Sequence, residues 1–158
     1  MSKNGNLLLS VPLRGDGSID SDERGILEDI AAWMGRNGEA IHGTRPWRSH
    51  GEGPTRVGGG MFSEGSSQPL TSEDIRFTAK DGALYAIALG WPASGTLRIA
   101  ALAQGSALAP GVIERVEALG STDSLTFSRS TRALEVRLPA GLAGTPAVAL
   151  KIRGPGLA

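Results

Sequence analysis

Apolar side chains recur at every second position in six short runs between residues 60 and 152, and this pattern limits the possible folds most strongly. The alternating residues are Ile75 and Phe77; Tyr85, Ile87, Leu89 and Trp91; Leu97 and Ile99; Leu125 and Phe127; Leu134, Val136 and Leu138; and Val148, Leu150 and Ile152. Such alternation is typical of β-strands with one buried face. Turn-forming residues close each run, as Lys80-Asp81-Gly82 does, and no helical pattern lies among them. The runs therefore predict an antiparallel β-sandwich of six or seven strands.

The beginning of the chain has a different pattern. Residues 6–12 (NLLLSVP) are apolar without alternation, which is typical of a parallel strand buried on both faces. Residues 21–37 carry apolar side chains at three- and four-residue spacing, which predicts an amphipathic helix. Asp20 or Ser21 is suited to the N-cap, and Gly38 to a left-handed position after the helix. Strand and helix make one β-α unit, which cannot satisfy both edges of its strand alone.

These patterns predict three segments. We expect a terminal strand and helix at 1–47, a linker at 48–59 and the antiparallel β-sandwich at 60–158. The fold class is thus mainly β, and α+β overall, with the sandwich preceded by one β-α unit.

Composition excludes several kinds of partner. Lys and Arg total 16 and Asp and Glu total 16, so the formal net charge is +0 and no basic field favours nucleic acid or an anionic membrane. The absence of Cys removes disulfides and thiolate chemistry. No apolar stretch reaches the roughly 18 residues of a membrane span, and no signal peptide is recognisable. We therefore expect no nucleic-acid partner, no membrane and a cytoplasmic location for the chain as given, although a parent enzyme could be exported.

Three stretches of sequence carry a family resemblance. They are GNLLLSVPLRGDGSIDSDERGILEDIAAWMGRNGEAIHGTRPW, GEGPTRVGGGMF and EDIRFTAKDGALYAIALGWP. Together they resemble the C-terminal end of the α-L-fucosidases of glycoside hydrolase family 29. The resemblance implies a (β/α)8-like catalytic barrel followed by a β-sandwich. Residues 6–12 then correspond to the last barrel strand and residues 21–37 to the last barrel helix.

The resemblance also has consequences for the chemistry. Its members are retaining hydrolases, which need two carboxyl groups beside the glycosidic bond. The family nucleophile and acid/base both precede the region matched here. We therefore carry over no catalytic residue, expect no cofactor, and expect the chain to be a truncated member of the family.

The histidines are candidates for a metal site. His42 and His50 are the only two in the chain, and Glu52 follows closely. A metal needs three or four convergent ligands, and this spacing does not predict them. We expect no metal.

Four acids lie in Gly-rich loops: Asp16, Asp20, Glu52 and Glu64. Any two could in principle stand about 5 Å apart, as retention requires. A solvated loop acid or a helix cap is the simpler interpretation of each.

Trp47, Trp91 and His50 are the candidates for substrate binding. Exposed tryptophans can stack on sugar rings, as in carbohydrate-binding modules. The resemblance instead suggests that Trp47 and Trp91 tie the sandwich to the barrel, and Trp33 falls on the apolar face of the helix.

Two functions from different classes remain. In the first, the chain is the C-terminal fragment of an α-L-fucosidase, which releases terminal α-L-fucosyl residues, and its sandwich supports the barrel. In the second, it is a self-associating or glycan-binding β-sandwich module without hydrolytic activity. Because Leu7, Leu8, Leu9 and Val11 lack a partner strand, we expect a homo-oligomer formed through the N-terminal strand and helix. A fucosylated glycan is a partner only if a site is formed.

Overall fold

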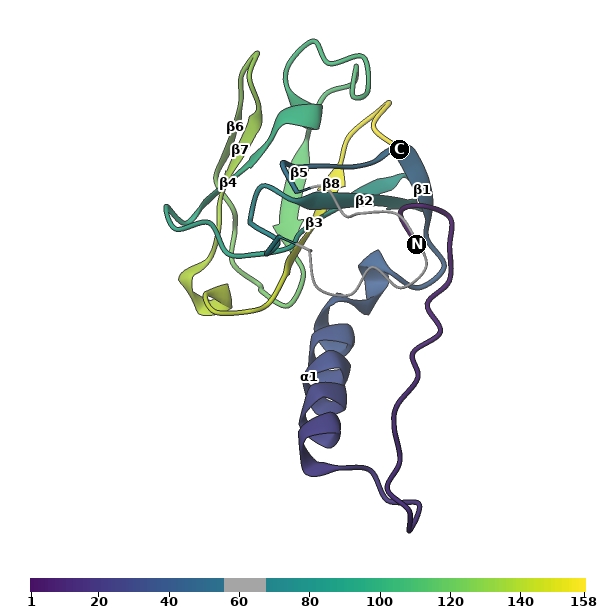
Figure 1. Cartoon of the computed structure of the whole chain (residues 1–158). Coiled ribbons are helices and arrows are strands. Elements are labelled where there is room, and N and C mark those ends of the chain that lie inside the picture. Colours follow the sequence, from purple (N-terminus) through teal and green to yellow (C-terminus); the bar gives the residue numbers. More distant parts are fainter. Residues whose placement is uncertain (56–67) are drawn as a thin grey trace.

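Two antiparallel β-sheets face each other in the computed structural model, which describes residues 1–55 and 68–158 (Figure 1). The larger sheet has the order β1-β2-β3-β8-β5 and the smaller sheet the order β4-β7-β6. The strands are β1 (Arg45–Glu52), β2 (Ile75–Lys80), β3 (Ala83–Ala88), β4 (Thr96–Ile99), β5 (Arg115–Ala118), β6 (Phe127–Arg129), β7 (Leu134–Arg137) and β8 (Val148–Arg153). The predicted antiparallel sandwich is confirmed.

The core lies between the two sheets and is made by the alternating residues. Phe77, Leu84 and Leu150 of the larger sheet pack with Leu97 and Val136 of the smaller one, and all five are fully or almost fully buried. Burial of such side chains stabilises the fold by about 1.5–3 kcal/mol each. The inward-facing side chains of the two sheets therefore stabilise the sandwich.

The β2–β3 hairpin follows directly from its turn residues. Lys80 pairs with Ala83, and the two residues between them, Asp81 and Gly82, have φ angles of 51° and 72°. Two successive positive φ angles define the turn that best fits the twist of a hairpin, and Asp-Gly is a preferred sequence for it. The predicted turn at Lys80-Asp81-Gly82 is confirmed.

Strands β1 and β5 were not predicted. Residues 48–52 of the expected linker belong to β1, which pairs with β2 across an irregularity between Pro46 and Gly51. That strand buries only Trp47 fully, so its sequence carries no alternation of large apolar residues. Strand β5 alternates Val116 with the small Ala118. The division of the chain into domains stays a prediction.

Helix α1 (Ser21–Asn37) has the predicted bounds. The Asp20 side chain caps it by accepting the backbone N–H of Asp22 at 2.9 Å. The prediction for Gly38 is wrong, because its φ of −58° and ψ of −23° are right-handed. The chain continues instead into a short 3₁₀ helix, η1 (Gly38–Ala40), where a Cβ on Gly38 would lie only 3.0 Å from the His42 ring.

The short helix η1 fastens this part of the chain to the larger sheet. Thr78 donates its hydroxyl to the Ala40 carbonyl at 2.7 Å, and Tyr85 donates its hydroxyl to Glu39 at 2.7 Å. Glu39 also accepts Lys151. Strand β3 is consequently buried on both faces, with Tyr85 and Ile87 under η1 and the end of α1.

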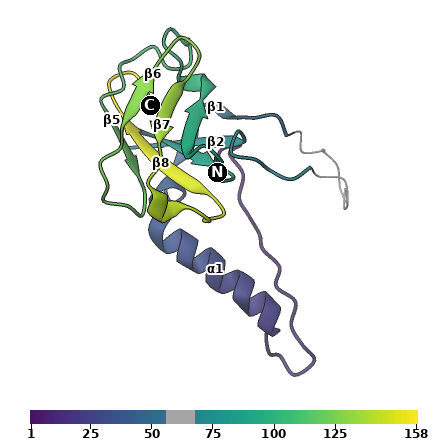
Figure 2. The same cartoon turned by 90° about the vertical axis from the view of Figure 1, so that its left-hand side faces the viewer.

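Residues 6–12 are extended but form no β-bridge to any described residue (Figure 2). The segment runs beside α1, which projects away from the sandwich, and both views show this arrangement. Leu7 is 84% and Leu8 95% exposed, so the burial predicted for this strand does not occur within the chain. The reason is that no strand among the described residues lies beside the segment to complete its ladder.

Candidate functional site

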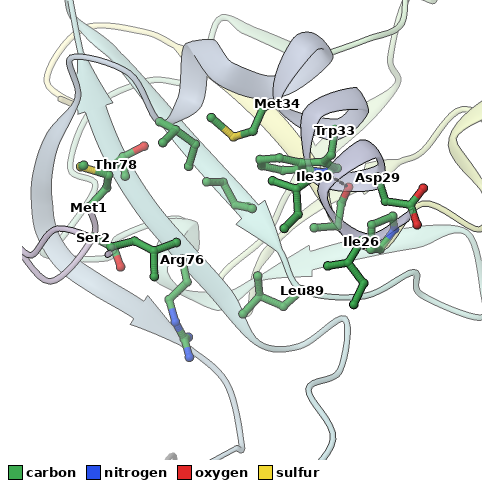
Figure 3. Close-up of a pocket in the computed structure, with 15 residues that line it drawn as sticks. Met1, Ser2, Ile26, Asp29, Ile30, Trp33, Met34, Arg76, Thr78 and Leu89 are labelled. Carbon is green, nitrogen blue, oxygen red and sulfur yellow. Dashed lines mark hydrogen bonds between the residues drawn. The ribbon is translucent and has the colours of Figure 1, made fainter. Parts of the chain in front are cut away.

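An apolar groove separates α1 from the outer face of the larger sheet (Figure 3). Ile26, Ile30 and Trp33 form its wall on α1, and Ile87 and Leu89 lie on the sheet side. Its volume is about 710 Å³, and Met1 and Leu7 also contribute to its lining. Contiguous exposed apolar surface of this kind marks an interaction site in soluble proteins.

The groove exists because α1 meets the sandwich only near its C-terminal end. Trp33 donates its indole N–H to the Ala147 carbonyl at 2.9 Å, and the Asn37 amide donates to the Trp33 carbonyl at 3.0 Å. One and two turns earlier, Ile30 is 43% and Ile26 is 56% exposed. The apolar stripe predicted from the sequence therefore continues beyond the surface that the sandwich covers.

A smaller, polar cavity lies at the edge of the larger sheet. Its volume is about 350 Å³. It is lined by Lys3, His50, Gly51, Glu52, Gly53, Thr55 and Arg76. The Arg76 guanidinium points away from the apolar groove in Figure 3, while its stem helps to line that groove.

Glu52 holds the two sheets together at this edge. Its carboxylate accepts the backbone N–H groups of Ala100 and Ala101 at 2.8 and 2.6 Å, at the end of β4. Burial raises the pKa of Glu52 and outweighs the opposite effect of these two hydrogen bonds. Both oxygens are committed to the backbone, so this carboxylate has a structural role.

Asp74 organises the wall of the polar cavity. It is fully buried and accepts four hydrogen bonds, two from the N–H and hydroxyl of Thr55 and two from those of Thr71, at 2.8–3.0 Å. Burial alone would raise the pKa of Asp74, but the hydrogen bonds from Thr71 and Thr55 prevail and lower it. The Asp74 carboxylate therefore stays ionised at neutral pH and holds Thr55, which lines the polar cavity, in place.

The candidate substrate-binding residues do not form one site. Trp47 is only 7% exposed, donates its indole N–H to Leu157 and meets the Phe77 ring edge-on with centroids 5.0 Å apart. Trp91 is half-buried and packs against the same core. His50 is exposed at the rim of the polar cavity.

The candidate acids are also distributed. Asp16 accepts the N–H and hydroxyl of Ser18, whose hydrogen bonds lower its pKa. Asp20 caps α1, and hydrogen bonds from Arg14 and the Asp22 N–H lower its pKa. Glu64 lies outside the described residues. Within the described ranges, no three His, Asp or Glu side chains converge as metal ligands, so His42, His50 and Glu52 are not brought together.

Sequence reasoning missed Arg76, Lys3 and Asp29. Arg76 occupies an outward position between the buried Ile75 and Phe77, so the alternation could have placed it on the outer face of its strand. Lys3 and Asp29 reach the cavities through the path of the chain, which no local pattern encodes. In the part of the chain that the structure describes, no helix combines the length and apolar character needed to cross a bilayer.

Comparisons with known proteins give a consistent result. The family model described as alpha-L-fucosidase C-terminal domain matches residues 68–153, and that described as alpha-L-fucosidase matches residues 1–39. An alpha-L-fucosidase of Branchiostoma floridae is 32% identical over 99 residues. Human tissue alpha-L-fucosidase is 31% identical over 99 residues. Each match covers 63% of this chain, which spans only 18% of the length of these relatives.

Solved structures extend the similarity over almost the whole chain. The crystal structure of Thermotoga maritima alpha-fucosidase superposes with a TM-score of 0.67 at 27% identity. The match covers 96% of this chain and 31% of that chain.

Proposed function

The chain belongs to the α-L-fucosidase family, and from this premise we propose that it is a supporting C-terminal part of such an enzyme and supplies no catalytic carboxylate. On this proposal, the sandwich and α1 pack on a catalytic β/α barrel that removes terminal α-L-fucosyl residues from glycans. The sandwich is the rigid element, and α1 with residues 6–12 provides the contact.

The placement of the carboxylates is the observation that carries this proposal. Retaining hydrolysis needs two carboxyl groups about 5 Å apart, one as nucleophile and one as acid/base. The apolar groove has a single acid, Asp29, in its lining, and the polar cavity has a single acid, Glu52. Three further acids already have structural hydrogen bonds. Asp20 caps α1, Glu39 accepts the Tyr85 hydroxyl of the larger sheet, and Asp74 accepts the Thr55 hydroxyl. None of these arrangements offers the paired carboxylates of a glycosidase.

The family matches support a catalytic barrel as the occupant of the apolar groove. The C-terminal domain model covers residues 68–153, which make most of the closed sandwich. The other fucosidase model covers residues 1–39, which carry the exposed Leu7, Leu8 and Ile26. Among the described residues, most of the large exposed apolar side chains thus lie in the portion of sequence matched by the second model. We infer that the barrel covers it.

Hydrolysis of an aryl α-L-fucoside by the purified chain tests the proposal. The chain is assayed beside Asp29→Asn, Glu52→Gln and Asp16→Asn variants and a mock preparation from the same host. We expect no turnover above the mock preparation. Turnover that is lost in Asp29→Asn or Glu52→Gln would contradict the proposal, because a carboxylate of this chain would then take part in the reaction.

Self-association is a second candidate, favoured by the exposed and unpaired residues 6–12. Two copies that pair these segments antiparallel would complete a ladder and form a closed dimer. Light scattering over a hundredfold concentration range separates the candidates. A mass that rises to a discrete multiple supports self-association, and a constant monomer mass excludes it.

A further inference from the structure

The polar cavity gathers basic side chains from three separate segments of the chain. Lys3 comes from the N-terminal segment, His50 from β1 and Arg76 from β2. Arginine and lysine side chains are cationic at neutral pH. Lys3 and Arg76 therefore bring two positive charges to the cavity, beside the single carboxylate of Glu52, in a chain whose formal net charge is +0.

These charges have no carboxylate partner within the described residues. The ion pairs found there join Arg14 to Asp20, Arg98 to Glu135, Arg115 to Glu117 and Lys151 to Glu39. The acid of the polar cavity, Glu52, is held by the backbone of Ala100 and Ala101 instead. Arg76 uses one terminal nitrogen for the carbonyls of Ile75 and Glu52 at 3.2 and 3.4 Å. The rest of its guanidinium fork is available to a ligand.

The shape of the cavity is fixed by the backbone around it. Gly51 and Gly53 leave its floor without side chains, and a Cβ on Gly53 would lie 2.6 Å from the Asp74 Cα. Asp74 holds Thr55 by two hydrogen bonds. The volume of about 350 Å³ lies within the range of small-ligand pockets, roughly 300–1,000 Å³. The cavity is thus large enough for a sugar-sized group.

We propose that the polar cavity is an oxyanion-binding site, suited to the sulfate or carboxylate substituent of an acidic sugar. The planar Arg76 guanidinium can donate two parallel hydrogen bonds to either group. Lys3 and His50 approach from the other chain segments. Lys3 adds a positive charge and N–H donors, and His50 adds an imidazole N–H donor. This inference does not rest on the hydrolytic role proposed for the family.

Calorimetric titration of the full chain with inorganic sulfate, at ionic strength held constant with chloride, tests the site. We expect saturable binding in the millimolar range that weakens at least about tenfold in Arg76→Met, which keeps the apolar stem. Arg132→Met is the matched control, because Arg132 is an exposed arginine of the β6–β7 turn. It should bind sulfate as the unchanged chain does.

Further arms identify the source of the anion and protect the test from misfolding. A sulfated monosaccharide that binds more tightly than sulfate supports a sugar ligand, equal affinity supports the free anion, and neutral fucose should not compete. If Arg76→Met fails to fold, Lys3→Gln and His50→Gln replace it in the test. Each of these two variants should weaken sulfate binding. Lack of saturation by 100 mM sulfate, or equal weakening in Arg132→Met, would overturn the proposal.

Discussion

The sandwich buries most of its large apolar side chains, whereas residues 6–12 and the start of α1 leave most of theirs exposed. Phe77 in the sandwich is fully buried, whereas Leu8 in the N-terminal segment is 95% exposed. Both positions lie in extended backbone, but only Phe77 belongs to a strand with paired neighbours on both sides. Within the described residues, the leucine side chains of residues 6–12 therefore stay exposed because no strand pairs with them.

The family matches divide the chain in the same way. The residues of the C-terminal domain model make a closed core, and residues 1–39 leave an apolar groove. Because stable domains bury their apolar faces against other elements, this difference supports the proposal that a barrel covers residues 1–39.

Removing a core side chain should have the largest effect. Phe77→Ala should lower the free energy of unfolding by about 3–5 kcal/mol, because it deletes a fully buried ring and its edge-on contact with Trp47. Chemical denaturation gives the value. Leu8→Ala is the control and should change stability by less than about 0.5 kcal/mol. Equal losses in the two variants would remove the contrast between the regions.

Two glycines should differ in the same way. Gly53→Ala should cost about 2–3 kcal/mol, because Gly53 has a φ of 133° and a Cβ there would collide with Asp74. Gly5 has open space around it, so Gly5→Ala should stay within about 0.5 kcal/mol of the unchanged chain. Thermal or chemical unfolding measures both. If Gly53→Ala left the free energy of unfolding unchanged, the close contact between Gly53 and Asp74 would be contradicted.

Asp74 predicts a pH dependence. Its pKa is lowered below the ordinary value of 3.8, so its contribution is complete above that value and is lost as the pH falls through the folded pKa. Asp74→Asn should cost about 1–2 kcal/mol at pH 7, because an amide N–H replaces one acceptor. The stability difference between the two proteins should shrink below pH 4. A constant difference from pH 7 to pH 2 would contradict the assignment.

The smallest effect on stability should come from the N-terminal segment. Leu8→Lys should leave the free energy of unfolding within about 0.5 kcal/mol of its original value, because the side chain is 95% exposed. The same change should reduce binding of a hydrophobic dye, since it interrupts exposed apolar surface. Glu28→Gln on exposed α1 is a control, because it changes the net charge by the same one unit. If Leu8→Lys bound the dye as strongly as the unchanged chain does, the dye-binding apolar surface would not include Leu8.

Sequence patterns predict the elements whose signals are local. The β2–β3 hairpin and α1 were found because alternation, the Asp-Gly turn and the Asp20 cap are encoded within a few residues. Strand β1 was missed, because its pairing with β2 is set by tertiary contact and only Trp47 is fully buried along it. Gly38 was misread because a close approach to His42, not a left-handed turn, favours glycine there.

The candidate site was less predictable than the fold. His50 was identified from the sequence as a candidate, but its neighbours in the polar cavity, Lys3 and Arg76, come from segments far from it in sequence. No spacing rule relates residues that the topology brings together. Trp47, also a candidate from the sequence, is buried against Phe77 in the core of the sandwich, which no local pattern around it encodes.

Amide hydrogen exchange, followed residue by residue at a concentration where light scattering shows a monomer, tests the central contrast most directly. The amides of β3 and β8 should exchange only through opening of the whole sandwich, because both strands are paired on two sides. Those of Leu7, Leu8 and Leu9 should exchange at nearly unprotected rates. Protection of these three amides equal to that of β3 would contradict the account, because residues 6–12 would then have a partner within the chain.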